Sequence, residues 1–162
     1  MYQYTDFDRQ FVKLRAQQFR DQLERWQRGE LTDEQLLPLR LQNGWYIQRY
    51  APMARIAVPY GEISSLQLRT LGRIAREYDK PDPELLARAQ ATQDQLEASQ
   101  PGQTLPAPPL KYGYGHFTTR TNCQFNWIPI TKAADVMDLL ASVCMHGIQT
   151  SGNDIRNITC DA

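Results

Sequence analysis

The stretch 114–127, YGHFTTRTNCQFNW, constrains the fold most, because its side chains alternate without a break. One face carries the polar residues His116, Thr118, Arg120, Asn122, Gln124 and Asn126. The other face carries Phe117, Thr119, Thr121, Cys123, Phe125 and Trp127. A period of two with aromatic and β-branched residues predicts one long strand. Its apolar face is suited to packing on helices, and its polar face is a row of hydrogen-bonding groups without a carboxylate.

Helix and strand signals flank this stretch on both sides. Helices are predicted after Thr5, after Thr32 with Gln35 completing a capping box, and over 64–78 behind Ser64 and Gln67. Pro38 is expected to limit the second helix, and Leu68 to lie on the core face of the third. Another helix is predicted after Thr131. Strands are predicted over 45–48, 54–59 and 155–160.

This order of elements predicts an α+β fold, a small mixed sheet with helices on one face, preceded by a helical arm. We divide the chain into an arm and lead-in, 1–50, and a domain, 51–162. Residues 81–111 are polar and rich in proline, and we expect them to form an exposed insertion. The apolar stripe of the arm packs either on its own domain or on another part of a larger protein. Because the chain stops just after the last predicted strand, we expect a cut within a larger protein.

The composition argues against a nucleic-acid binder, a membrane protein, a secreted protein and a metal site. Eighteen Lys and Arg balance eighteen Asp and Glu, so the basic excess typical of nucleic-acid binders is absent from the sequence. No apolar run reaches the roughly 18 residues of a membrane span, and no signal-peptide core begins the chain, so we expect a cytoplasmic location. The spacing of Cys123, Cys144 and Cys160 matches no metal or redox motif. We therefore predict no metal ligands in this chain.

Three arginines lie in or beside separate predicted strands: Arg55, Arg120 and Arg156. If helices cover the opposite face of the sheet, these guanidinium groups can converge and bind carboxylates or oxyanions bidentately. Each of them can equally be a surface ion-pair partner. The residues alone thus indicate an anion-binding face and leave its ligand open.

Four separated motifs resemble the N-terminal part of the β-component of the sulfite/nitrite reductase hemoproteins. They are LRLQNGWYIQR (39–49), PMARIAVPYG (52–61), GHFTTRTNCQFNW (115–127) and IQTSGNDIRNIT (148–159). The resemblance implies a ferredoxin-like half-domain whose sheet faces sirohaem. It implies an oxidoreductase of sulfur or nitrogen assimilation that reduces sulfite to sulfide, or nitrite to ammonia, by six electrons. The complete enzyme would hold sirohaem, a haem, and a 4Fe–4S iron–sulfur cluster. Its partners would be its own C-terminal half and an electron donor, either an NADPH flavoprotein or a ferredoxin.

The resemblance also assigns roles to residues. It places Arg55 and Arg156 on the substrate side, where they would contact sulfite or nitrite. It implies cofactor-binding positions at Arg55, Arg120, Gln124, Thr118, His116, Asn126 and Arg156. His116 stands where some members have arginine, and Asn126 where some have histidine. The cysteines that hold the cluster in the family have no counterparts in this chain, so we expect the chain alone to be inactive.

Two alternatives need no catalysis. A ferredoxin-like sheet carrying Phe117, Phe125 and Trp127 could bind single-stranded RNA, although these aromatics lie opposite the arginines. The chain could also be an interaction module that docks on a partner through its helical arm.

Overall fold

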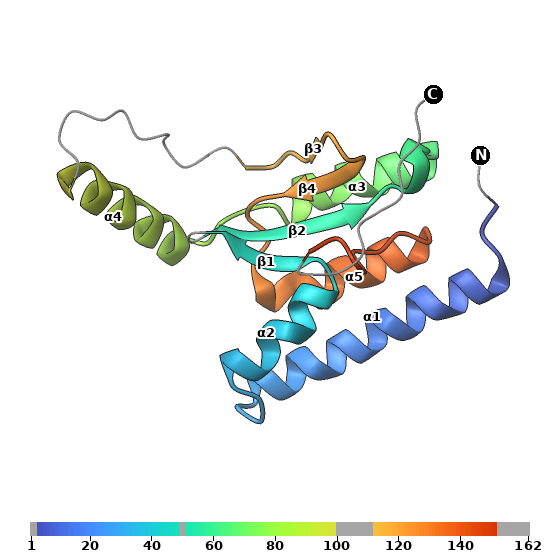
Figure 1. The fold of residues 1–162 in the computed structure, drawn as a ribbon, viewed down its shortest axis with the longest axis horizontal. Helices are drawn as coiled ribbons and strands as arrows, with labels where there is room; N and C mark the ends of the chain where they lie inside the picture. Colours follow the sequence, from blue (N-terminus) through green and yellow to red (C-terminus); the bar gives the residue numbers. More distant parts are fainter. Residues whose placement is uncertain (1–2, 49–50, 100–111, 152–162) are drawn as a thin grey trace.

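A computed structural model of the chain describes residues 3–48, 51–99 and 112–151 (Figure 1). Its strands form a four-stranded antiparallel sheet in the order β1-β2-β4-β3. The elements are α1 (Asp6–Gln27), α2 (Asp33–Gln42), β1 (Trp45–Gln48), β2 (Ala51–Ala57), η1 (Pro59–Gly61), α3 (Ser65–Glu77), α4 (Pro83–Ser99), β3 (His116–Phe117), β4 (Asn122–Phe125), η2 (Ile130–Lys132) and α5 (Ala133–Ser142). The predicted α+β class, with a small sheet and a helical arm, is confirmed. The strand predicted over 155–160 lies outside the described residues.

Capping residues set the starts of the first three helices. Thr5 with Asp8, Thr32 with Gln35, and Ser64 with Gln67 each form a reciprocal capping box. Each box gives acceptors to backbone N–H groups that the first helical turn leaves unpaired, which stabilises the helix by about 1 kcal/mol. The three starts predicted from the sequence are therefore confirmed.

The arm α1 packs along α5 of its own domain, which decides between the two alternatives left open above (Figure 1). Its buried residues are Val12, Ala16, Phe19 and Leu23. Arg20 also donates to Asp135 at 2.9 Å and to Asp138 at 2.6 Å, both on α5. These ion pairs are partly exposed, so they contribute at most about 1 kcal/mol, and the apolar stripe holds the arm.

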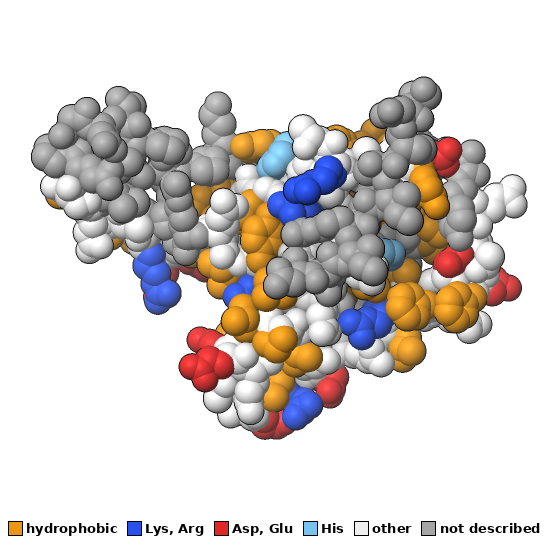
Figure 2. Space-filling view, viewed as in Figure 1, with side chains coloured by type: hydrophobic (Ala, Val, Ile, Leu, Met, Phe, Trp, Pro, Cys, Tyr) orange, Lys and Arg blue, Asp and Glu red, His pale blue; other side chains and the backbone are white. Residues whose placement is uncertain are grey.

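The N-terminal half of α1 also exposes apolar side chains. Phe7 is 73% exposed and stacks on Phe11, and Leu14 lies one turn further along. Figure 2 shows hydrophobic side chains at the surface over this part of α1. No described helix has the length and apolar character needed to cross a membrane.

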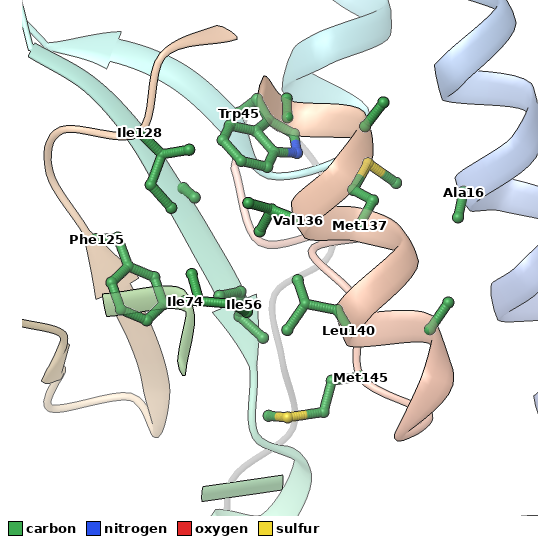
Figure 3. Close-up of a cluster of buried hydrophobic side chains, with 14 of the residues drawn as sticks. Ala16, Trp45, Ile56, Ile74, Phe125, Ile128, Val136, Met137, Leu140 and Met145 are labelled. Carbon is green, nitrogen blue, oxygen red and sulfur yellow. The ribbon is translucent and has the colours of Figure 1, made fainter. Parts of the chain in front are cut away.

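The core lies between the sheet and helices α1, α3 and α5 (Figure 3). Ile56 of β2 and Phe125 of β4 project from the sheet, and Val136 and Leu140 of α5 and Ile74 of α3 meet them. These five side chains are at most 2% exposed, and burying each contributes about 1.5–3 kcal/mol. The same alternation puts Arg55, between Ala54 and Ile56, on the opposite face of β2.

The long strand predicted over 114–127 is wrong in one respect, because the chain folds there into a hairpin. β3 and β4 pair antiparallel, with His116 opposite Gln124 and Phe117 opposite Cys123. The turn between them closes when Thr118 N–H donates to the Asn122 carbonyl at 2.8 Å. The hydroxyl of Thr118 in turn accepts from Asn122 N–H, and Thr121 adopts a φ of 54°. Such local bonds offer the backbone an alternative to an extended strand, and the sequence alternation continues through the turn.

Three further expectations are corrected. Pro38 lies inside α2 rather than ending it; buried Leu36 holds the helix, and Asn43 donates to the Leu39 carbonyl at its end. Leu68 is 51% exposed, and Gln67 is buried in its place because its amide donates to Tyr4 and to the Val143 carbonyl. Helix α5 begins after η2 without a side-chain cap, rather than behind Thr131.

The segment 81–111 contains a helix with a buried residue. Ala89 of α4 is 0% exposed and clusters with Ala51, Met53 and Trp127, with Leu85 packed against them. This second, smaller cluster lies on the face of β2 that also carries Arg55. The described part of the insertion is therefore not wholly exposed.

Candidate functional site

The candidate site is built around Arg55, on the face of the sheet opposite the main core. Arg55 of β2 is the register partner of Gln124 of β4, so both side chains leave the same face. Tyr46 of β1 alternates with core-facing Trp45 and therefore shares that face. Three strands thus each contribute one polar side chain.

Each of these three side chains is hydrogen-bonded to the other two. Gln124 Oε1 accepts from Arg55 Nη2 at 2.9 Å, from Arg55 Nε at 3.2 Å and from the Tyr46 hydroxyl at 2.7 Å. Arg55 Nη2 also donates to the Tyr46 hydroxyl at 2.9 Å, and the guanidinium carbon lies 5.1 Å from the centre of the Tyr46 ring. The guanidinium is thus fixed in place by neutral groups.

A fourth contact comes from the loop after α5. Arg55 Nη1 donates to the Thr150 carbonyl at 3.3 Å, and the Thr150 hydroxyl donates to the Arg55 carbonyl at 2.7 Å. Two glycines allow this loop to approach. A Cβ on Gly147 would lie 2.7 Å from the Arg55 carbonyl, and one on Gly44 would lie 2.6 Å from the Gly147 carbonyl. Gly44 also has a φ of +82°, which a side chain would disfavour.

The charge of Arg55 has no carboxylate partner among the described residues. Its contacts are an amide oxygen, a hydroxyl and a carbonyl, none of which carries a formal charge. They occupy four of its five N–H groups, which leaves one on Nη1. A half-buried guanidinium held in this way is suited to an anionic ligand, because only an anion would neutralise it.

Two asparagines extend the polar face along β4. Gln124 Nε2 donates to Asn126 Oδ1 at 3.2 Å, and both residues are buried. Asn122, also buried, donates to the Arg120 carbonyl at 3.2 Å, but its Oδ1 has no hydrogen-bond partner among the described residues. A buried acceptor without a partner costs about 1–3 kcal/mol, a cost that a bound water molecule would offset.

The structure brings together only part of the predicted site. Arg55, Gln124 and Asn126 are linked, and His116 lies opposite Gln124 on the neighbouring strand. Thr118 closes the hairpin turn, and Arg120 lies exposed within that turn. Arg156 lies outside the described residues. The convergence of three arginines therefore stays a prediction.

Sequence reasoning missed Tyr46 and Thr150. Tyr46 could have been found, since it alternates with an apolar Trp45 in a strand that was predicted. Thr150 gave no such signal, because its contact with Arg55 spans 95 positions and depends on how the loop folds back.

The described residues offer little for metal ligation. They contain no group of three His, Cys, Asp or Glu side chains that could hold a metal ion. Cys123 faces the core, and burial raises the pKa of its thiol to about 12, whereas a metal ligand must be a thiolate. Burial lowers the pKa of His146, so its imidazole is neutral at pH 7, and its Nδ1 accepts from Ile148 N–H at 3.2 Å.

The aromatic residues do not form a base-stacking platform. Phe125 lies in the main core and Trp127 in the smaller cluster, each 0% exposed, and Phe117 is 54% exposed at the sheet edge. Stacking of single-stranded bases needs exposed rings on one surface. This arrangement argues against the RNA-binding alternative.

No family model, curated protein or solved structure matches this chain. On the sheet face opposite the main core, the residues of the candidate site hold a half-buried guanidinium in place through neutral groups.

Proposed function

We propose that this chain is the N-terminal part of a cytoplasmic sulfite or nitrite reductase hemoprotein, and that its Arg55 face binds sirohaem carboxylates and the oxyanion substrate. The observation that carries the proposal is a half-buried guanidinium held by neutral oxygens, without a carboxylate partner in the described chain. The four-motif resemblance supports the choice of ligand. When bound, sirohaem supplies the iron centre at which six-electron reduction takes place.

The residues present suit the periphery of such a ligand. Sirohaem is flat and carries many carboxylates, and Arg55 offers a fixed, half-buried guanidinium on a pleated sheet face. Asn122 Oδ1 on the same face, a buried acceptor that no described residue satisfies, could accept from a bound water molecule. Arg55 would then hold and orient the anion while Gln124 and Tyr46 keep the guanidinium from swinging away.

The iron–sulfur cluster does not fit the described residues. Cys123 faces the core, where burial raises the pKa of its thiol to about 12 and so disfavours the thiolate that a cluster needs. The cluster ligands and the electron donor would have to come from other segments, so we propose that residues 1–162 alone do not catalyse reduction. Sustained reduction of sulfite or nitrite by this chain, with sirohaem and a chemical reductant, would contradict that part of the proposal.

A titration of the chain with sirohaem, followed by the absorbance of the macrocycle, tests the binding. Changing Arg55→Met should weaken binding about tenfold, since a hydrogen bond to a charged group contributes roughly 1.5–3 kcal/mol. Arg55→Lys should restore part of the loss, because it keeps the charge but not the planar fork. The matched control is Arg88→Met, which removes an exposed arginine on α4. Equal affinities for the wild-type chain and Arg55→Met would overturn the proposal.

A further inference from the structure

A second recognition surface lies at the opposite side of the sheet, between α3 and the edge strand β3. A groove of about 250 Å³ opens there, with Leu68, Gly72 and Ala75 of α3 on one wall and Phe117 and Cys123 on the other. Leu68 is 51% exposed and Phe117 54%, so both walls present apolar surface to solvent. None of the residues that line the groove is charged.

The strand wall of this groove has backbone groups available for pairing. β3 is the last strand in the order β1-β2-β4-β3 of the described sheet. Thr118 and Asn122 form a hydrogen-bonded pair, so the antiparallel alternation makes Phe117 and Cys123 a non-hydrogen-bonded pair. The N–H and C=O of Phe117 therefore point away from β4, toward the outer edge, where an added strand could bind them.

The helix wall is rimmed by positive charge. Arg69 and Arg76 are two helical turns apart on the exposed side of α3, next to Leu68 and Gly72. Arg76 Nη1 lies over Gly72, only 3.3 Å from where a Cβ would be. Among the described ion pairs, only Arg73 of this helix has a carboxylate partner, Glu77. The rim is thus complementary to an acidic ligand.

We propose that this groove binds an extended, acidic segment of a partner protein, which adds to the sheet beside β3. Main-chain bonds to Phe117 would hold the segment, one apolar side chain would enter the groove, and flanking carboxylates would meet Arg69 and Arg76. The groove volume, the edge position of β3 in the described sheet and the basic rim are three separate observations that lead to the same ligand. The inference does not depend on the function proposed for the Arg55 face.

The test uses a fluorescein-labelled peptide of three Glu-Val repeats, with blocked ends, and follows its anisotropy with the complete chain 1–162. Val and Glu alternate, so one face is apolar and the other acidic when the peptide is extended. Binding of this peptide is expected, while the same peptide with Lys in place of Glu should not bind. A third peptide with Pro in place of Val should also not bind, because its proline residues lack the N–H that an added strand needs.

Two protein variants on α3 examine the basic rim and the apolar interior of the groove without disturbing the core. Arg76→Glu should weaken binding of the Glu peptide about fivefold or more and should improve binding of the Lys peptide. Gly72→Leu fills the groove; its new Cβ would meet only the end of the flexible Arg76 side chain, at 3.3 Å, and leucine also favours the helix more than glycine does. It should abolish binding while the circular dichroism spectrum stays unchanged. Lys13→Glu, the same charge reversal on exposed α1, is the matched control and should bind as the wild type does.

Three results would overturn the proposal. The first is no binding of the Glu peptide to the wild-type chain. The second is equal binding to the wild type and to Gly72→Leu. The third is self-association of the chain, by sedimentation, that Gly72→Leu abolishes, since a second copy would then be the occupant.

Discussion

Mutation of Asp79 tests how segments that are distant in the sequence are held together next to the sheet that carries Arg55. Its side chain is 1% exposed, and three backbone N–H groups donate to its carboxylate: Trp127 at 2.8 Å, Gly113 at 2.9 Å and Tyr114 at 3.2 Å. The residue thus ties the end of α3 to the segment before β3 and to the segment after β4. Asp79→Ala removes all three hydrogen bonds together.

The expected cost follows from the burial of each donor. Trp127 is fully buried, so losing its acceptor should cost about 1–3 kcal/mol, whereas Gly113 and Tyr114 are exposed enough for water to substitute, at about 0.5 kcal/mol each. The sum is about 2–4 kcal/mol. For a domain of this size it corresponds to a fall in Tm of roughly 4–16 °C.

The pH dependence provides an independent check. Burial raises the pKa of Asp79, although backbone N–H groups donating to it act in the opposite direction. The native state therefore keeps the proton to higher pH than the unfolded chain does. The stability that this group contributes is fully present below its unfolded pKa and is lost as the pH rises through the raised pKa of the folded state. In Asp79→Asn, which cannot titrate, this component of the pH dependence should vanish.

Urea denaturation, followed by tryptophan fluorescence between pH 3 and pH 8, measures both effects. Asp21→Ala, which removes an exposed aspartate on α1, is the control and should lie within about 0.5 kcal/mol of the wild type. An Asp79→Ala variant within 1 kcal/mol of the wild type would refute the proposed role of this carboxylate. A wild-type advantage over Asp79→Asn that grows with pH would refute the direction of the pKa shift.

Two other predictions concern the loop beside Arg55 and the core cysteine. Gly147→Ala should destabilise the fold by more than about 2 kcal/mol in urea denaturation, because the new Cβ would overlap the Asn43 and Arg55 carbonyls, which are backbone atoms and cannot rotate away. Gly29→Ala is the control without overlap: no atom lies within 4 Å of its new Cβ, so it meets only the strain of its positive φ of 77° and should cost less. An unchanged midpoint for Gly147→Ala would contradict the close crossing. Cys123 should resist iodoacetamide at pH 8 while the chain is folded and should react in urea, because burial raises the pKa of its thiol to about 12. Mass spectrometry of the alkylated peptide measures the labelling. Rapid labelling of the folded protein would contradict this prediction.

The sequence-based predictions of helix starts and of the face that Arg55 occupies were correct, because they depend on local signals. The capping residues Thr5, Thr32 and Ser64 mark helix starts because their bonds reach only three residues along the chain. The alternation around Arg55 placed it opposite Ile56 because β2 is a regular strand with one core-facing side. Predictions based on interactions between near neighbours in the chain were thus correct at these positions, although the local signals at Pro38 and Thr131 were misleading.

Features that depend on distant contacts could not be derived. The turn at Thr118–Thr121 lacks glycine and proline, so the hairpin gave no local signal, and its residues continue the alternation of the strands. Gln67 is buried in place of Leu68 because Tyr4 and Val143 accept from its amide, and both lie more than 60 positions away. The contact of Thr150 with Arg55 also joins residues that are far apart in the chain, by 95 positions.

The four bonds that Arg55 makes in the absence of a ligand have a consequence for affinity. An arginine side chain that is ordered only on binding loses up to about 2 kcal/mol in rotational freedom at that moment. For Arg55 this loss of entropy occurs when the chain folds, because hydrogen bonds to Gln124, Tyr46 and Thr150 hold the side chain in one rotamer before any ligand binds. An arginine in an exposed turn, such as Arg120, would undergo that loss only when an anion arrives. Of the two, Arg55 should therefore discriminate more strongly by the shape of the anion, and Arg120 mainly by its charge.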